Sequence, residues 1–124
     1  MQHYHSLEAA SFQNSWLTIG VFDGVHRGHR EIIQKLVSDA HAHHAPAVVL
    51  TFDPHPATVL TGREIRCLTT PDERANLLAS LGVDVVITQR FTPNLSTATA
   101  LEYMTTLKKS LGLSHLLIGY DFAL

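Results

Sequence analysis

Hydrophobic positions along the chain follow two alternating patterns. Short apolar runs bounded by polar residues predict buried strands at 16–22, 47–52, 83–88 and 115–119. After the first run the spacing becomes helical, with an apolar stripe made of Ile32, Ile33, Leu36, Val37 and Ala40. This stripe predicts a helix that begins near Gly28 and ends before Pro46.

Start signals predict two further helices. Thr70 can cap a helix, Pro71 suits the first helical position, and Glu73 completes a capping box. This helix is expected to end near residue 82. Thr99 opens a similar capping box, and its helix is expected to run to about residue 112.

The alternation of strand and helix predicts an α/β fold. Buried apolar strands joined by helices indicate a parallel sheet covered on both faces, in a Rossmann-like, doubly wound arrangement. In such sheets, ligands bind beyond the carboxyl ends of the strands. The segments "FDGVHRGH", "FDPHP" and "GYDF" each follow a predicted strand. We therefore expect all three to gather at one edge of the sheet.

Composition narrows the classes of protein to consider. The chain has 124 residues, of which 45% are hydrophobic, a combination that suits one globular domain. A formal net charge of −2 does not favour a nucleic-acid or membrane partner. Cys67 is the single cysteine, which fits a reducing cytoplasm. We see neither a secretory signal nor an apolar stretch that would span a bilayer.

The segment at residues 22–29 has the make-up of an anion site. Gly24 and Gly28 remove side chains where strand turns into helix, so backbone N–H groups can approach an anion. His26 and His29 are three residues apart, and both imidazoles can point the same way. Asp23 can orient one of them or receive a metal-bound water.

Spacing alone leaves other interpretations open. A glycine-rich turn with two surface histidines fits the same residues. The His-x-x-His pair also suits zinc, although spacing fixes no third ligand nearby. The histidine-rich segment "HAHHA" at 41–45 looks like a metal site too. We interpret it as a solvated helix end, where a cationic histidine suits the helix dipole.

The same residues resemble a known family. His26-Arg27-Gly28-His29 resembles the HxGH motif of the nucleotidyltransferase superfamily. The longer stretch "LTIGVFDGVHRGH" is similar to the N-terminal module of prokaryotic FAD synthetase, usually a bifunctional riboflavin kinase and FMN adenylyltransferase. Two further stretches, "VVLTFDPHPATVL" and "LLIGYDFAL", agree in order and spacing. The resemblance covers about residues 16–124.

The resemblance implies adenylyl transfer from ATP to FMN, giving FAD and pyrophosphate. It implies that His26 and His29 are catalytic and contact the ATP phosphates, and that Mg²⁺ arrives with ATP rather than in a protein cage. The implied ATP-binding residues are Gly20, Phe22, Asp23, Gly24, His26, Gly28 and His29. The implied flavin-binding residues are Asp53, His55, Pro56, Asp121 and Phe122.

The chain also departs from the family pattern. It stops at Leu124, whereas the family continues with more sheet, a Ser/Thr-rich ATP motif ending in arginine, and a riboflavin kinase barrel. We therefore expect a partial adenylyltransferase domain over 1–124, a sheet incomplete at its C-terminus, and a kinase domain in the full-length protein. Two alternatives remain. One is another HxGH nucleotidyltransferase, against which "FDPHP" and "GYDF" argue; the other is a catalytically incomplete nucleotide- or flavin-binding fragment.

Overall fold

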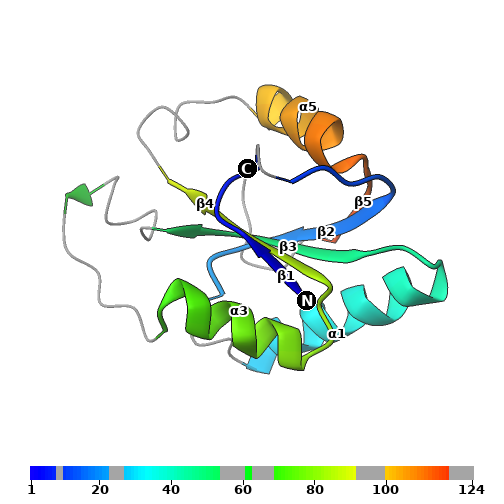
Figure 1. Cartoon of the computed structure of the whole chain (residues 1–124), viewed down its shortest axis with the longest axis horizontal. Coiled ribbons are helices and arrows are strands. Elements are labelled where there is room, and N and C mark those ends of the chain that lie inside the picture. The colour runs from blue at the N-terminus through cyan, green and yellow to red at the C-terminus, as the bar shows by residue number, and fades with distance from the viewer. Residues whose placement is uncertain (8–9, 23–26, 54–60, 63–68, 92–99, 118–124) are drawn as a thin grey trace.

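A five-stranded parallel sheet forms the centre of the molecule (Figure 1). The computed structural model describes residues 1–7, 10–22, 27–53, 61–62, 69–91 and 100–117. The strands are β1 (Gln2–Tyr4), β2 (Ser15–Ile19), β3 (Ala47–Asp53), β4 (Val85–Arg90) and β5 (Leu113–Leu116). They lie in the order β1-β4-β3-β2-β5, and each neighbouring pair is parallel.

Helices cover both faces of this sheet, as expected from the sequence. The helices α1 (Arg27–Ala42) and α3 (Pro71–Ser80) lie on one face, and α5 (Ala100–Leu111) lies on the other (Figure 1). Ile33 of α1 and Leu78 of α3 are buried in one apolar cluster, while Leu107 of α5 is buried in the second. The arrangement confirms the α/β fold class. No helix in the described part of the chain has both the length and the apolar character needed to cross a membrane.

The predicted strands are confirmed, with shifted ends. β4 starts at Val85 rather than at residue 83, and Asp84, just before it, contacts β3 and α1 through its side chain. The Oδ2 atom of Asp84 accepts a hydrogen bond from the backbone N–H of Ala47 (2.9 Å) and lies 2.7 Å from Nε2 of His41. β5 begins at Leu113, two residues earlier than expected, while residues 118 and 119 lie outside the described residues.

The end of β2 differs from the prediction for a reason specific to tertiary packing. The apolar run continues to Phe22, yet the strand ends at Ile19. Phe22 has a φ of 52°, in the left-handed region that side chains other than glycine rarely adopt, and it turns the chain toward α1. Its ring is buried in the apolar cluster that contains Ile33 and Leu36 of α1. Burial of the ring thus offsets the cost of the backbone conformation.

The N-terminal strand β1 is absent from the sequence prediction. It pairs with β4, with His3 opposite Val86, and stands at the edge of the described sheet. Its three residues are polar or half-exposed, so no apolar run marks it. The strand matters because it brings the first residues of the chain beside β4.

The start of α3 confirms the predicted capping box in detail. The hydroxyl of Thr70 accepts a hydrogen bond from the backbone N–H of Glu73 (3.1 Å). The carboxylate of Glu73 accepts one from the backbone N–H of Thr70 (3.0 Å). Pro71 occupies the first helical turn, where its missing N–H costs nothing. Thr99, which predicted a cap for α5, lies outside the described part of the chain, whereas its expected partner Glu102 stands in the first turn of the helix.

Candidate functional site

The carboxyl ends of the parallel strands share one edge of the sheet. From β2 the chain proceeds to β3 and then β4 on one side, and it returns with β5 on the other side of β2. The order of strands therefore reverses beside β2, and in open α/β sheets ligands bind at such a reversal. At β5, the backbone N–H of Leu117 still donates to the carbonyl of Leu17 (2.8 Å), which keeps the two strand ends together.

The described residues on either side of residues 23–26 are tightly packed. The ring of Phe22 meets the imidazole of His29 edge-on, with centroids 5.0 Å apart and an angle of 84°. The same ring lies over Gly20, where an added Cβ would come within 2.8 Å of it. Thr51 of β3 donates a hydrogen bond to the carbonyl of Val21 (2.7 Å). These contacts fix where His29 sits relative to the end of β2.

The first turn of α1 suits an anion. Residues 27–30 contain no acidic side chain, and His29 is the third residue of the helix. The N–H groups of a first helical turn have no partner within the helix, and the helix dipole favours negative charge there. Gly28 is the second residue of the helix. The other residues expected to bind ATP, Asp23, Gly24 and His26, lie outside the described residues.

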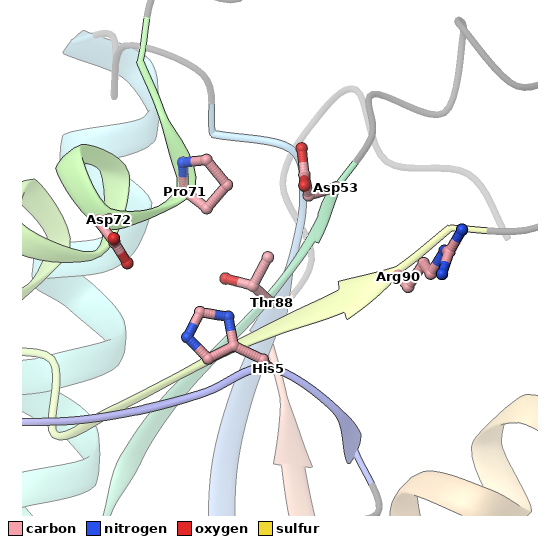
Figure 2. A pocket seen from close by; sticks show the side chains of 6 residues that line it. All are labelled: His5, Asp53, Pro71, Asp72, Thr88 and Arg90. Carbon is pink, nitrogen blue, oxygen red and sulfur yellow. The ribbon is translucent and has the colours of Figure 1, made fainter.

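An open cleft of about 510 Å³ lies at the same edge, beyond β3 and β4 (Figure 2). We call it the strand-end cleft. Its lining residues come from the segment after β1, the ends of β3 and β4, and the start of α3. They are His5, Asp53, Pro71, Asp72, Thr88 and Arg90. The backbone N–H of Phe91 donates to the carbonyl of Asp53 (3.1 Å), so the two strand ends stay paired at the cleft.

The residues expected to bind flavin are only partly placed. Asp53 lines the strand-end cleft, at the edge where it was expected. His55, Pro56, Asp121 and Phe122 lie outside the described residues. Asp53 is joined in the cleft by Arg90, its neighbour across the β3–β4 pair, which the sequence did not single out.

A buried arginine connects β3 to the start of α3. Arg74 of α3 is only 2% exposed. One guanidinium nitrogen, Nη1, donates to the hydroxyl of Thr51 (3.3 Å) and to the carbonyl of Phe52 (3.2 Å). The Nε and Nη2 atoms reach the hydroxyl and the carbonyl of Thr69 at 3.4 and 3.5 Å. Arg74 therefore joins the end of β3 to the residues that precede α3.

His3 carries a shifted pKa beside the cleft. Its Nε2 atom lies 2.7 Å from the hydroxyl of Thr88, and its Nδ1 atom lies 3.5 Å from a carboxylate oxygen of Asp72. Burial is the main cause that lowers the pKa of His3, and the neighbouring His5 lowers it further, while Asp72 opposes the shift. His3 is thus held more firmly in its neutral form than an exposed histidine.

Sequence reasoning missed both Arg74 and the histidines of the N-terminal segment. A signal for the histidines exists: in "HYH", His3 and His5 are two residues apart, and in an extended chain such residues lie on the same side. Their rings are 4.4 Å apart. No local pattern marks Arg74, because its partners come from β3 and from the loop before α3.

The family model and the curated relatives agree on one family. Residues 8–124 match the family model described as FAD synthetase. A bifunctional riboflavin kinase/FMN adenylyltransferase of Escherichia coli is 37% identical over 120 residues, covering 95% of this chain and 38% of that protein. The protein of the same name from Listeria monocytogenes is 33% identical, covering 89% of this chain and 36% of its own length. A protein named FAD synthetase from the same organism is 36% identical and covers 86% and 44%.

A solved structure supports the fold independently. A crystal structure titled as a macrolide-efflux protein from Streptococcus pneumoniae superposes with a TM-score of 0.83 and covers 98% of this chain and 41% of that one. Its sequence identity is 23%, so the likeness bears on the fold alone. The chain spans about two fifths of the length of the curated relatives it matches.

Proposed function

Because the chain belongs to the FAD synthetase family, we propose that the protein containing it transfers AMP from ATP to FMN, forming FAD and pyrophosphate. The observation that carries this proposal is the family match over residues 8–124, joined by relatives whose names include FMN adenylyltransferase. The relatives named as bifunctional support a riboflavin kinase domain elsewhere in the full-length protein.

The proposed reaction needs no nucleophile from the protein. A phosphate oxygen of FMN attacks the α-phosphorus of ATP, and the bond from that phosphorus to the bridging oxygen breaks, so pyrophosphate leaves with the electron pair. The work of the protein is to hold the two phosphates in line and to stabilise the charge that develops.

His29 is the described residue best placed for that work. It lies in the first turn of α1, where backbone N–H groups and the helix dipole favour the ATP phosphates. Its contact with the buried ring of Phe22 supports a fixed imidazole position, and a fixed donor stabilises a transition state better than a mobile one. We propose that His26 is its partner, with Gly20, Asp23, Gly24 and Gly28 shaping the same pocket.

The strand-end cleft is the proposed flavin side of the site. Its volume lies within the range of small-molecule pockets, and Asp53 stands in it at the end of β3. We assign His55, Pro56, Asp121 and Phe122 to the same side because of their family resemblance. Arg90 adds a cationic side chain in the cleft, suited to an anionic ligand.

We expect Mg²⁺ to enter with ATP. The carboxylate of Asp53 offers an oxygen ligand of the hard kind that Mg²⁺ prefers, so the residues present fit such an ion. When bound, Mg²⁺ neutralises charge on the ATP phosphates. We further propose that the substrates are small molecules in the cytoplasm, without a nucleic-acid or membrane partner, which the net charge of −2 supports.

The test is a substrate screen with the full-length protein. ATP with FMN is expected to give FAD, detected by chromatography, together with stoichiometric pyrophosphate. CTP, and acceptors such as a pantetheine phosphate, are expected to give no product. Turnover of one of those pairs instead would identify another nucleotidyltransferase. Binding of ATP or FMN by calorimetry without pyrophosphate release would identify a binding module, and either result would overturn the proposal.

A further inference from the structure

Two histidines and a carboxylate converge at the corner of the strand-end cleft. They are His3 on β1, His5 just after it, and Asp72 in the first turn of α3. One ligand atom from each of these side chains lies within 4.8 Å of the other two. Figure 2 shows the imidazole of His5 and the carboxylate of Asp72 at the same end of the cleft, away from Arg90.

We propose that His3, His5 and Asp72 form a binding site for a zinc-type divalent cation. Two imidazole nitrogens and a carboxylate oxygen are ligands that Zn²⁺ takes readily, with a fourth position left for water. Nitrogen ligands disfavour Mg²⁺, which prefers oxygen. The site is separate from the magnesium that accompanies ATP, and it does not depend on the adenylyl transfer proposed above.

The surroundings of His3 favour metal binding through Nδ1. Its Nε2 atom lies 2.7 Å from the hydroxyl of Thr88, which can accept the ring proton there. Histidines that bind metals usually donate their other ring N–H to an oxygen in this manner, which fixes the tautomer and the ring. Nδ1 is then left with a lone pair that faces Asp72.

The distance between those two atoms fits an ion between them. Nδ1 of His3 lies 3.5 Å from a carboxylate oxygen of Asp72. Two ligands each about 2.1 Å from a tetrahedral ion are about 3.4 Å apart. A lone pair and a carboxylate oxygen repel each other at this distance, and a cation between them converts the repulsion into two bonds.

The site would join parts of the chain that lie far apart in sequence. His3 and His5 belong to the edge strand and its following turn, whereas Asp72 belongs to α3. A metal held by all three would fasten β1 to α3 at the rim of the cleft. The proposed role is therefore to fix one wall of the cleft, and binding is expected to stabilise the folded protein.

Isothermal calorimetry with ZnCl₂ tests the proposal. The experiment uses the full-length protein prepared without a histidine tag, because a tag would bind the same ion. His5→Gln and Asp72→Asn are suitable variants because both side chains are exposed, that of Asp72 to 80%, so the fold is expected to survive. His44→Asn is the matched control: His44 is an exposed histidine of the "HAHHA" segment.

The expected result is one tight Zn²⁺ site that each of the two cluster variants weakens by about tenfold or more, while His44→Asn leaves it unchanged. Excess Mg²⁺ is expected not to compete. Co²⁺ in place of Zn²⁺ is expected to give the strong visible absorption of a four-coordinate ion in the parent and to lose it in His5→Gln. The absence of Zn²⁺ binding, or equal affinity in the parent and both cluster variants, would overturn the proposal.

Discussion

The N-termini of α1 and α3 stand at the same edge of the sheet and are built in opposite ways. Each helix follows the carboxyl end of a strand, so each directs the positive end of its dipole toward the region where ligands bind. α3 begins with its own acids, Asp72 and Glu73, in the first turn. The first turn of α1 contains no acid.

This difference separates a structural helix start from one suited to a substrate. The reciprocal hydrogen bonds between Thr70 and Glu73 occupy donors of α3. At α1, the described first turn offers Gly28 and His29 instead, and negative charge has to come from elsewhere. A phosphate ligand suits this helix start, whereas at α3 it would face two carboxylates.

The largest effect is expected from a change at α1. In His29→Ala, the kcat for FAD formation by the full-length protein is expected to fall about 10² to 10³-fold, because a positioned donor to the developing charge is lost. Binding of FMN, measured by fluorescence, is expected to persist. Steady-state kinetics with chromatographic detection of FAD gives the rate.

His29→Phe distinguishes loss of the donor from loss of packing. A phenyl ring can still pack beside Phe22 but has no N–H to donate. The rate is therefore expected to stay as low as in His29→Ala, while the melting temperature is expected to be higher than in His29→Ala. Thr70→Ala, at the start of α3, is the control that weakens a helix without touching the reaction. Full activity in His29→Ala would contradict the contrast between the two helices.

A smaller effect, on stability alone, is expected from the anchor of α3. Arg74→Met removes the hydrogen bonds that the guanidinium donates to the carbonyl of Phe52 and to Thr69. The free energy of unfolding, from urea denaturation, is expected to fall by about 2–3 kcal/mol. Arg74→Lys is expected to recover only part of it, because an ammonium group cannot reproduce the planar fork of guanidinium. Equal stability in Arg74→Met and the parent would count against the anchoring role.

The smallest effect is expected from acid titration of the α3 cap. Hydrogen bonds from the backbone and side chain of Thr70 hold the pKa of Glu73 below its ordinary value of 4.5. The folded state therefore releases this proton more readily than the unfolded chain. The stabilisation is complete above about pH 4.5 and is lost as the pH falls through the lowered pKa.

Melting temperatures measured against pH check this sign. Glu73→Gln is expected to show a shallower fall at low pH than the parent protein. Thr70→Ala is expected to lose about 1 kcal/mol near neutral pH yet keep part of the acid dependence, since its backbone N–H still serves Glu73. Identical acid profiles for Glu73→Gln and the parent would refute the role of this carboxylate.

The sequence predicts those parts of the fold whose causes are local. The cap of α3 lies within four consecutive residues, so Thr70 and Glu73 predict it without information from the rest of the chain. β3 is a continuous apolar run buried on both faces, and such a run predicts a strand without further information. Position at the sheet edge was also predictable for Asp53, because parallel strands place their carboxyl ends together.

Other features depend on contacts that no local pattern contains. β2 ends early because Phe22 folds back over Gly20, and only the packed structure shows that glycine leaves room for the ring. β1 is too short and polar to be marked by hydrophobicity. Arg74 was missed because its partners lie on other segments, and buried arginines have no sequence signature of their own.

The pairing of β1 with β4 has a consequence for how the protein folds. His3 and Thr88 are 85 positions apart, and β5 pairs with β2 over a still longer separation, with Ser15 opposite Leu113, whereas β2, β3 and β4 pair in sequence order. Closing so long a loop costs chain entropy that only a finished β4 can offset, so we expect β1 to dock after β2, β3 and β4 have paired. Its amides are then expected to exchange hydrogen sooner than those of β3, and protection of β1 equal to that of β3 would refute this order.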